Sequence, residues 1–277
     1  MDKLNNKAIG VFDSGYGGLS VLKEIIKLMP DYDFNYLGDN ARTPYGNRSF
    51  EAVYTYTLQS VKKLFELGSE LVILACNTAS AKALRTIQQE YLPTLNQPWK
   101  RVLGVIRPSV EIIGKYTNSS HVGVLGTRGT VASNSYPLEI HKIYPEITVQ
   151  QEACPMWVAL VENNEFNNDG ADYFIENNII NILSLDNQID TLILGCTHYP
   201  LLIEKIKKYT PKHISILSQG EIVANSLKDY LNRHPEMDAM CSKNSIHKFY
   251  TTDSPKLFKE FGSIFCDKIN NVKQIEL

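Results

Sequence analysis

Two segments of this chain share one design, and this repetition constrains the fold more than any other sequence feature. The mostly apolar run Leu71–Leu74 leads through an alanine to Cys76, and the run Thr191–Gly195 leads directly to Cys196. Each run is long enough for one buried strand, and each cysteine precedes amide or hydroxyl side chains and a predicted helix. Ligands of open α/β sheets bind outside the carboxyl ends of the strands, so both thiols are expected where chemistry usually occurs.

Strands and helices are predicted to alternate along the whole chain. Further strand patterns occur at residues 8–12, 34–37, 102–106, 121–125, 147–151, 213–217 and 248–251. Apolar residues at helical spacing lie between them, for example in 19–29, 50–65 and 79–91. This alternation predicts a doubly wound α/β protein with mainly parallel sheets. Because the cysteine design occurs twice, we expect two similar lobes with a ligand cleft between them.

The length of the chain limits the number of domains, and its net charge indicates which partners to expect. A chain of 277 residues can form one large or two modest α/β domains. Its formal net charge of -2 gives no electrostatic reason to expect nucleic acid or an anionic membrane as a partner. The N-terminal residues 1–7 lack an apolar signal core, and no apolar run is long enough to cross a bilayer. We therefore expect a cytoplasmic protein.

The cysteines do not form a plausible disulfide framework. They are five in number and scattered, at Cys76, Cys154, Cys196, Cys241 and Cys266, so reduced thiols are the better interpretation. There is no Cys-x-x-Cys pair, and one cysteine two residues before a histidine lacks the four-ligand spacing of structural zinc. We expect no metal.

A site with two cysteine thiols indicates a different reaction from a site with a single thiol. A single active cysteine would suggest a nucleophile with histidine as its base. Two thiols that flank one tetrahedral carbon can instead invert it without a cofactor, because one removes a proton as thiolate while the other donates a proton to the opposite face. The reference pKa of a thiol, ~8.5, allows either proton state when neighbouring groups tune it.

Such a mechanism needs groups that orient the thiols and hold the substrate. Asp13, at the end of the first strand, and His198 are the candidates, one for each thiol. The alternatives are a helix N-cap for Asp13 and a loop residue with a backbone hydrogen bond for His198. Donors for the developing negative charge could come from the amides and hydroxyls of Ser14, Asn77, Thr78 and Thr197. The glycine-rich turn after Asp13 is also similar to a phosphate-binding turn, but it lacks the dinucleotide spacing.

Five sequence blocks stand in a fixed order between residues 8 and about 205. They are Asp13-Ser-Gly-x-Gly-Gly-Leu-Ser-Val21, Gly38-Asp-x-Ala-Arg-x-Pro-Tyr-Gly46, Ala75-Cys-Asn-Thr-Ala-Ser80, Gly126-Thr-x-Gly-Thr130 and Leu194-Gly-Cys-Thr-His-Tyr-Pro200. Together they resemble glutamate racemase, within the aspartate/glutamate racemase superfamily. No single block would be specific, but the ordered set is.

The resemblance implies a cofactor-independent, two-base interconversion of L- and D-glutamate that supplies D-glutamate for peptidoglycan. It implies that Cys76 and Cys196 are the acid/base residues, with Asp13 assisting Cys76 and His198 assisting Cys196. Glu162 matches a carboxylate that the family associates with the catalytic region, although a solvated helix residue is the alternative. The substrate-contacting pairs that it implies are Asp13-Ser14, Tyr45-Gly46, Asn77-Thr78 and Thr197-His198.

The resemblance also implies a division into domains. Residues 1–98 plus 210–277 would form the first lobe, and residues 99–209 the second. Two residues depart from the common pattern: Arg107 stands where many members have an acidic residue, and Gln219 where an aspartate is frequent. Neither is expected to touch the thiols, so these departures concern regulation and subunit packing. A homodimer is one arrangement that the family allows.

Two other functions stay open at this stage. A relative could act on another acidic substrate such as aspartate or a malonate, although single-thiol relatives would lack one of the two cysteines. A two-lobed binding or regulatory protein could close on an acidic ligand without turnover. The paired thiols argue against such a protein, because carboxylate binding requires donors and positive charge rather than cysteine.

Overall fold

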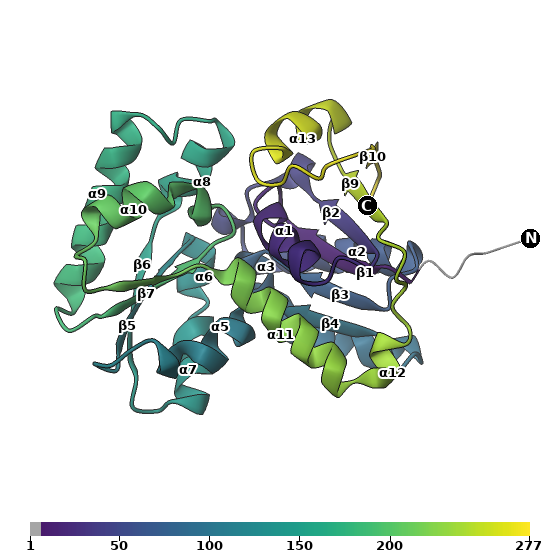
Figure 1. Ribbon diagram of the computed structural model, residues 1–277, viewed down its shortest axis with the longest axis horizontal. Coiled ribbons are helices and arrows are strands. Elements are labelled where there is room, and N and C mark those ends of the chain that lie inside the picture. Colours follow the sequence, from purple (N-terminus) through teal and green to yellow (C-terminus); the bar gives the residue numbers. More distant parts are fainter. Residues whose placement is uncertain (1–6) are drawn as a thin grey trace, which may run out of the picture.

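Two parallel sheets organise the chain, and each forms the centre of one lobe (Figure 1). The computed structural model describes residues 7–277; residues 1–6, which the search for a signal core included, lie outside the described residues. The first sheet has the order β10 (Val272–Gln274), β9 (His247–Thr251), β2 (Phe34–Gly38), β1 (Ile9–Asp13), β3 (Leu71–Leu74) and β4 (Arg101–Gly104). The second has the order β6 (Thr148–Ala153), β5 (His121–Gly126), β7 (Thr191–Gly195) and β8 (Ser215–Leu217). All of these strand pairs are parallel, as predicted.

The two strands that precede the cysteines are interior strands of their sheets. Strand β3 lies between β1 and β4, and β7 lies between β5 and β8. Every residue of both strands is buried, because helices cover both faces of a parallel sheet. This burial explains the nearly continuous apolar sequence of each strand. The turns that carry Cys76 and Cys196 follow the carboxyl ends of these two strands.

Helices cover both faces of the first sheet. Ile9 and Val11 face the side of α1 and α11, whereas Phe12 and Val72 face the side of α2, so alternate strand residues enter different cores. The helices of this lobe are α1 (Leu19–Leu28), α2 (Phe50–Glu66), α3 (Asn77–Lys82), α4 (Leu84–Thr86), α11 (Gln219–Arg233), α12 (Pro235–Asp238) and α13 (Pro255–Gly262). Ser49 caps α2 by accepting a hydrogen bond from the Ala52 amide.

The second sheet is covered in the same way. Helices α5 and α7 pack on the face of Val122 and Ile193, and α8, α9 and α10 pack on the face of Leu192. The helices of this lobe are α5 (Ile106–Ile112), α6 (Arg128–Ala132), α7 (Ser135–Ile143), α8 (Pro155–Glu162), α9 (Asp169–Leu185) and α10 (Ile203–Tyr209). The repeated sheet-and-helix design confirms the prediction of two similar lobes.

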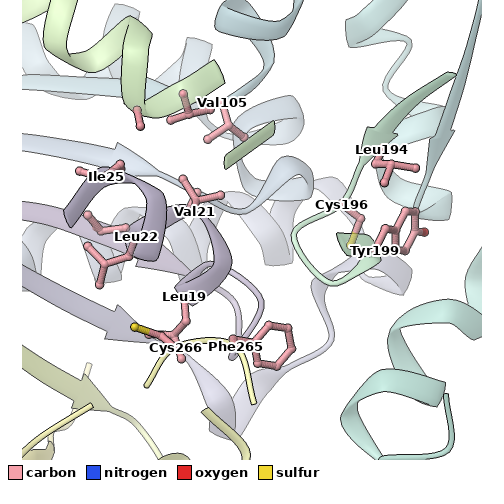
Figure 2. Packing of buried hydrophobic residues seen from close by; sticks show 14 of the residues in the cluster. Leu19, Val21, Leu22, Ile25, Val105, Leu194, Cys196, Tyr199, Phe265 and Cys266 are labelled. Atoms are coloured by element: carbon pink, nitrogen blue, oxygen red, sulfur yellow. The ribbon is translucent and has the colours of Figure 1, made fainter. Parts of the chain in front are cut away.

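One apolar core continues from one lobe into the other. It contains the buried face of α1 in the first lobe and Leu194, Cys196 and Tyr199 in the second. Figure 2 shows these groups on either side of Phe265, whose ring meets the His198 ring edge-on at a centroid distance of 5.6 Å. The lobes therefore share an apolar contact beside the strand ends.

The sheet pairing shifts both expected lobe boundaries. Strand β4, expected in the second lobe, pairs with β3 of the first sheet, and β8, expected in the first lobe, pairs with β7 of the second. The chain thus crosses between lobes after β4 and returns after β8, at the start of α11. Helix α11 then runs along α1 (Figure 1). The crossing that the resemblance implied, after residue 98, instead falls in a loop before the edge strand β4.

Other differences from the predicted elements are local. The helix expected over 79–91 is divided into α3, α4 and a π-helical turn at Ile87–Tyr91. The sequence pattern did not predict α12, α13 or the short strand β10. Within residues 7–277, no helix combines the length and apolar character that crossing a membrane requires.

Trp157 should be a major source of stability in the second lobe. Its side chain is fully buried, and its ring packs edge-on against Tyr199 at 4.7 Å. We expect Trp157→Ala to lower the free energy of unfolding by ~3–5 kcal/mol, because it leaves a large cavity. Trp99→Ala is the matched control, since Trp99 is 40% exposed. Urea unfolding measures both changes, and equal losses would contradict this account of the core.

Candidate functional site

Polar side chains from the carboxyl ends of both sheets meet at the junction of the lobes. Asp13 is the last residue of β1, and Thr197 follows Cys196 after β7. The Thr197 hydroxyl donates to Asp13 Oδ1 at 3.3 Å, and the Ser20 hydroxyl donates to the Thr197 carbonyl at 2.9 Å. These contacts join the turn after β1 to the turn that carries Cys196, across the junction.

Cys76 occupies the N-cap of α3. Its Sγ accepts from the Ala79 amide at 3.5 Å and donates to Ser14 Oγ at the same distance. The side chain is 6% exposed. Burial, together with the negative charge of Asp13, raises the pKa of the thiol to about 12. Cys76 is therefore a protonated thiol at neutral pH when no ligand is present.

Asp13 is fully buried beside this thiol. Burial raises the pKa of its carboxyl group, although the charge of His198 and the amides of Gly15 and Gly18 oppose that effect. The Gly15 amide donates to Asp13 Oδ2 at 2.9 Å. Gly18, rather than Asp13, is the N-cap of α1, so the alternative of a helix-capping role for Asp13 is wrong.

The second thiol belongs to a chain of side chains. Cys196 Sγ lies 3.8 Å from Nδ1 of His198, and Nε2 of that ring lies 3.1 Å from Glu162 Oε1. The Thr43 hydroxyl, from the first lobe, donates to the same carboxylate oxygen at 3.4 Å. Glu162 is therefore not merely a solvated helix residue, and His198 binds side chains rather than a backbone group.

His198 is held in its charged form by its neighbours. Burial alone lowers the pKa of the imidazole, but the hydrogen bonds and negative charges of Cys196 and Glu162 outweigh burial and raise the pKa well above its usual value. The raised pKa favours the imidazolium form, in which one ring N–H group faces the Cys196 sulfur and the other faces the Glu162 carboxylate.

Gly17 permits the close approach of this ring. A Cβ atom at Gly17 would lie 2.4 Å from both His198 Nδ1 and Thr197 Oγ1. Any side chain there would push the histidine away, so the glycine-rich turn after Asp13 serves packing across the junction. This packing accounts for Gly17 in the turn that resembled a phosphate-binding loop.

Tyr45 and Gly46 lie in a 3-10 turn, Tyr45–Asn47, at another side of the site. The Tyr45 hydroxyl donates to the buried carboxylate of Asp39. A Cβ atom at Gly46 would lie 2.8 Å from Thr127 Cβ, and the Thr127 hydroxyl is 2.9 Å from that of Thr78. The loop of the first lobe thus packs on the start of α6 in the second, and the structure brings this predicted pair to the same junction.

Asn77 has partners that the sequence did not predict. Its side-chain amide bonds to Gln219 at 2.5 Å and to Tyr136 at 2.8 Å. Because Asn77 directly follows Cys76, Gln219 contacts the residue next to this thiol.

Arg107 is half exposed and pairs with Glu111. The sequence did not predict the roles of Thr43 and Thr127, although both lie within the five sequence blocks. No pattern indicates which side chains of a block contact the other lobe.

All five cysteines are unpaired and buried. Two surface cavities of about 560 and 1020 Å³ are lined by residues other than Cys76 and Cys196. Cys76 and Cys196 are instead enclosed, with only 6% and 7% of each residue exposed. The site therefore excludes most water in this arrangement.

Known proteins are similar to this chain in sequence and in structure. The model of the family described as Asp/Glu/Hydantoin racemase matches residues 10–227. A glutamate racemase of Bacillus cereus is 40% identical over 273 residues, which cover 98% of each chain. The structure of glutamate racemase isoform RacE1 from Bacillus anthracis superposes with a TM-score of 0.89, at 34% identity, over 99% of this chain and 98% of that one.

A second solved structure extends the similarity. The glutamate racemase of Francisella tularensis, solved in complex with D-glutamate, has a TM-score of 0.85 and 31% identity, with 99% and 98% of the two chains covered. These matches confirm the resemblance that the five sequence blocks indicated, and they extend it over the whole length of the chain. The chain is an amino-acid racemase, an isomerase, and it belongs to the Asp/Glu/hydantoin racemase family.

Proposed function

We propose that this enzyme interconverts L- and D-glutamate with two cysteines as its acid and base. The observation that carries the proposal is the placement of Cys76 and Cys196 after interior strands of the two sheets, with both cysteine turns bonded to the turn after β1: Cys76 to Ser14, and Thr197 to Asp13. The names of the curated relatives support glutamate as the substrate. The D-glutamate complex of the Francisella tularensis relative also supports it.

The reaction balances without any added group. The thiolate of one cysteine takes the α-hydrogen of glutamate as a proton, and the C–H electron pair stays on the carbon as a carbanion conjugated with the carboxylate. The thiol of the other cysteine then gives a proton to the opposite face. One thiolate and one thiol are present before and after, so the two sulfurs simply exchange protonation states.

Each sulfur has an assisting group. The raised pKa of Cys76 fits a thiol that donates in the resting enzyme, and Asp13 is placed to receive the proton of Cys76 or to hold the substrate ammonium group. The imidazolium of His198 offers a proton or a positive charge to Cys196, and Glu162 orients that ring. Burial strengthens all of these charge interactions because little water screens them.

The remaining polar groups would hold the two carboxylates of glutamate. We assign this role to Ser14, Asn77, Thr78 and Thr197, together with the Tyr45–Gly46 turn. Backbone amides near the start of α3 and the hydroxyls of Thr78 and Thr197 are suited to an anion. The alternative is a racemase for another acidic substrate, such as aspartate.

The cellular role follows from the same proposal. The enzyme would supply D-glutamate for peptidoglycan synthesis in the cytoplasm, where buried thiols remain reduced, and it would need no cofactor. A homodimer stays a prediction of the family resemblance.

Direct observation of the reaction is the first test. Purified enzyme with a reductant and no pyridoxal phosphate is incubated in D₂O with L-glutamate, D-glutamate or L-aspartate. We expect inversion of both glutamate enantiomers with loss of the α-proton signal in NMR spectra, because the donated proton comes from solvent, and no change in aspartate. Inversion of aspartate but not glutamate would establish the alternative substrate, and silence towards all three would favour a binding protein.

Substitution of each sulfur tests the two-base mechanism. We expect Cys76→Ser and Cys196→Ser each to lower racemisation by at least about a thousandfold, because a serine hydroxyl is a far weaker acid and base at neutral pH. Elimination of a leaving group from one enantiomer of a β-substituted glutamate needs only one base, so it could survive in each variant. Cys154→Ser is the matched control and should retain activity. Full racemisation by either site variant would contradict the mechanism.

Glu162→Gln tests the assistance to His198. Loss of the carboxylate removes one cause of the raised pKa, so the pKa of the imidazole should fall and the imidazolium should lose its proton at a lower pH. We expect the alkaline limb of the kcat/KM profile to move to lower pH, with kcat reduced by about tenfold, the scale of one charge-assisted hydrogen bond. NMR titration of the histidine and a pH–rate profile measure the two effects. An unchanged histidine pKa would rule out this role for Glu162.

A further inference from the structure

A closed ring of hydrogen bonds lies behind the two cysteine turns. Gln219 Nε2 donates to the Tyr136 hydroxyl oxygen at 2.8 Å, and that hydroxyl donates to Asn77 Oδ1 at 2.8 Å. Asn77 Nδ2 completes the ring by donating to Gln219 Oε1 at 2.5 Å. Each side chain donates once and accepts once, so all three bonds run in the same direction and polarise one another.

The direction of this ring is fixed by its surroundings. Gln219 Nε2 also lies 3.1 Å from the Val105 carbonyl oxygen and 2.9 Å from Ser109 Oγ. A flipped Gln219 amide would place Oε1 against the carbonyl oxygen, where neither atom can donate. The three ring residues are at most 4% exposed. If one hydrogen-bond partner is removed, its neighbour therefore stays buried without a water molecule to replace the lost bond.

The ring touches both cysteine turns. Asn77 directly follows Cys76 and begins α3 of the first lobe. Tyr136 belongs to α7 of the second lobe, and its aromatic ring packs on Gly195, where a Cβ atom would lie 3.2 Å from Tyr136 Cε2. Gly195 directly precedes Cys196. The ring thus joins the residue after one thiol to the residue before the other.

We propose that Gln219 and Tyr136 are positioning residues that set the spacing of the two cysteines. This inference rests on the proposed racemisation. Neither side chain bonds to a sulfur; Gln219 acts through Asn77, and Tyr136 acts through Asn77 and Gly195. Proton transfer to opposite faces of one carbon depends steeply on donor–acceptor distance, so a small change in this spacing slows the chemical step. The ring also uses one N–H of Asn77 and leaves the second for a substrate oxygen.

The test removes single members of the ring. Tyr136→Phe keeps the aromatic packing on Gly195 and deletes only the hydroxyl group, while Gln219→Leu removes the whole amide. Tyr144→Phe is the matched control, because the Tyr144 hydroxyl links the end of α7 to α5 by donating to the Glu111 carbonyl at 2.9 Å, outside the ring. If Gln219→Leu fails to fold, Tyr136→Phe decides the test.

The measurements are steady-state kinetics with L- and D-glutamate and the primary isotope effect with α-deuterated substrate. We expect both ring variants to lower kcat by about tenfold or more, equivalent to ~1.4 kcal/mol in the barrier. We also expect them to increase the isotope effect on kcat/KM, because proton transfer becomes more rate-limiting. Tyr144→Phe should match the wild type in both quantities.

A merely structural role gives a different result. Partial unfolding reduces the concentration of active enzyme, which lowers the apparent kcat but leaves the isotope effect and KM unchanged. That result, or wild-type kinetics in Tyr136→Phe, would overturn the inference while the proposed function stands. An inactive wild-type enzyme would overturn both.

Discussion

The site depends on the removal of charged and ionisable groups from water. Asp13, Cys76 and His198 are buried between two sheets, and each has a pKa above its usual value. Such groups are tolerated only where neighbouring groups compensate for lost hydration. Here the amides of the glycine-rich turn compensate Asp13, and Glu162 compensates His198. The fold supplies these neighbours because strands from both lobes end at the same junction.

Much of this arrangement could be predicted from the sequence. The alternation of strands and helices predicts the α/β class, and the strand-end rule predicts that Asp13, Cys76 and Cys196 lie at the carboxyl ends of the sheets. These inferences succeed because they use local pattern and a rule that holds for nearly all parallel sheets. The role of Gly17 was not accessible in this way, since its cause is a histidine far along the chain.

Contacts across the junction could not be predicted. The bonds of Gln219 to Asn77 and of Thr43 to Glu162 join residues more than a hundred positions apart, and no period or spacing encodes them. The lobe boundaries failed for a related reason. Strands β4 and β8 are short and lie at sheet edges, so their sheet is decided by pairing partners rather than by their own sequences.

The order of the strands also governs the order in which the molecule can be completed during synthesis. Strands β5 to β8 are contiguous in sequence, so the second sheet is entirely translated before β9 and β10 exist. The first sheet pairs β2 with β9, which is separated from it by the whole second lobe. Closing that long loop costs entropy and delays the pairing. On the ribosome, the inserted lobe can fold early, whereas the lobe that carries Cys76 closes only when the C-terminus has emerged.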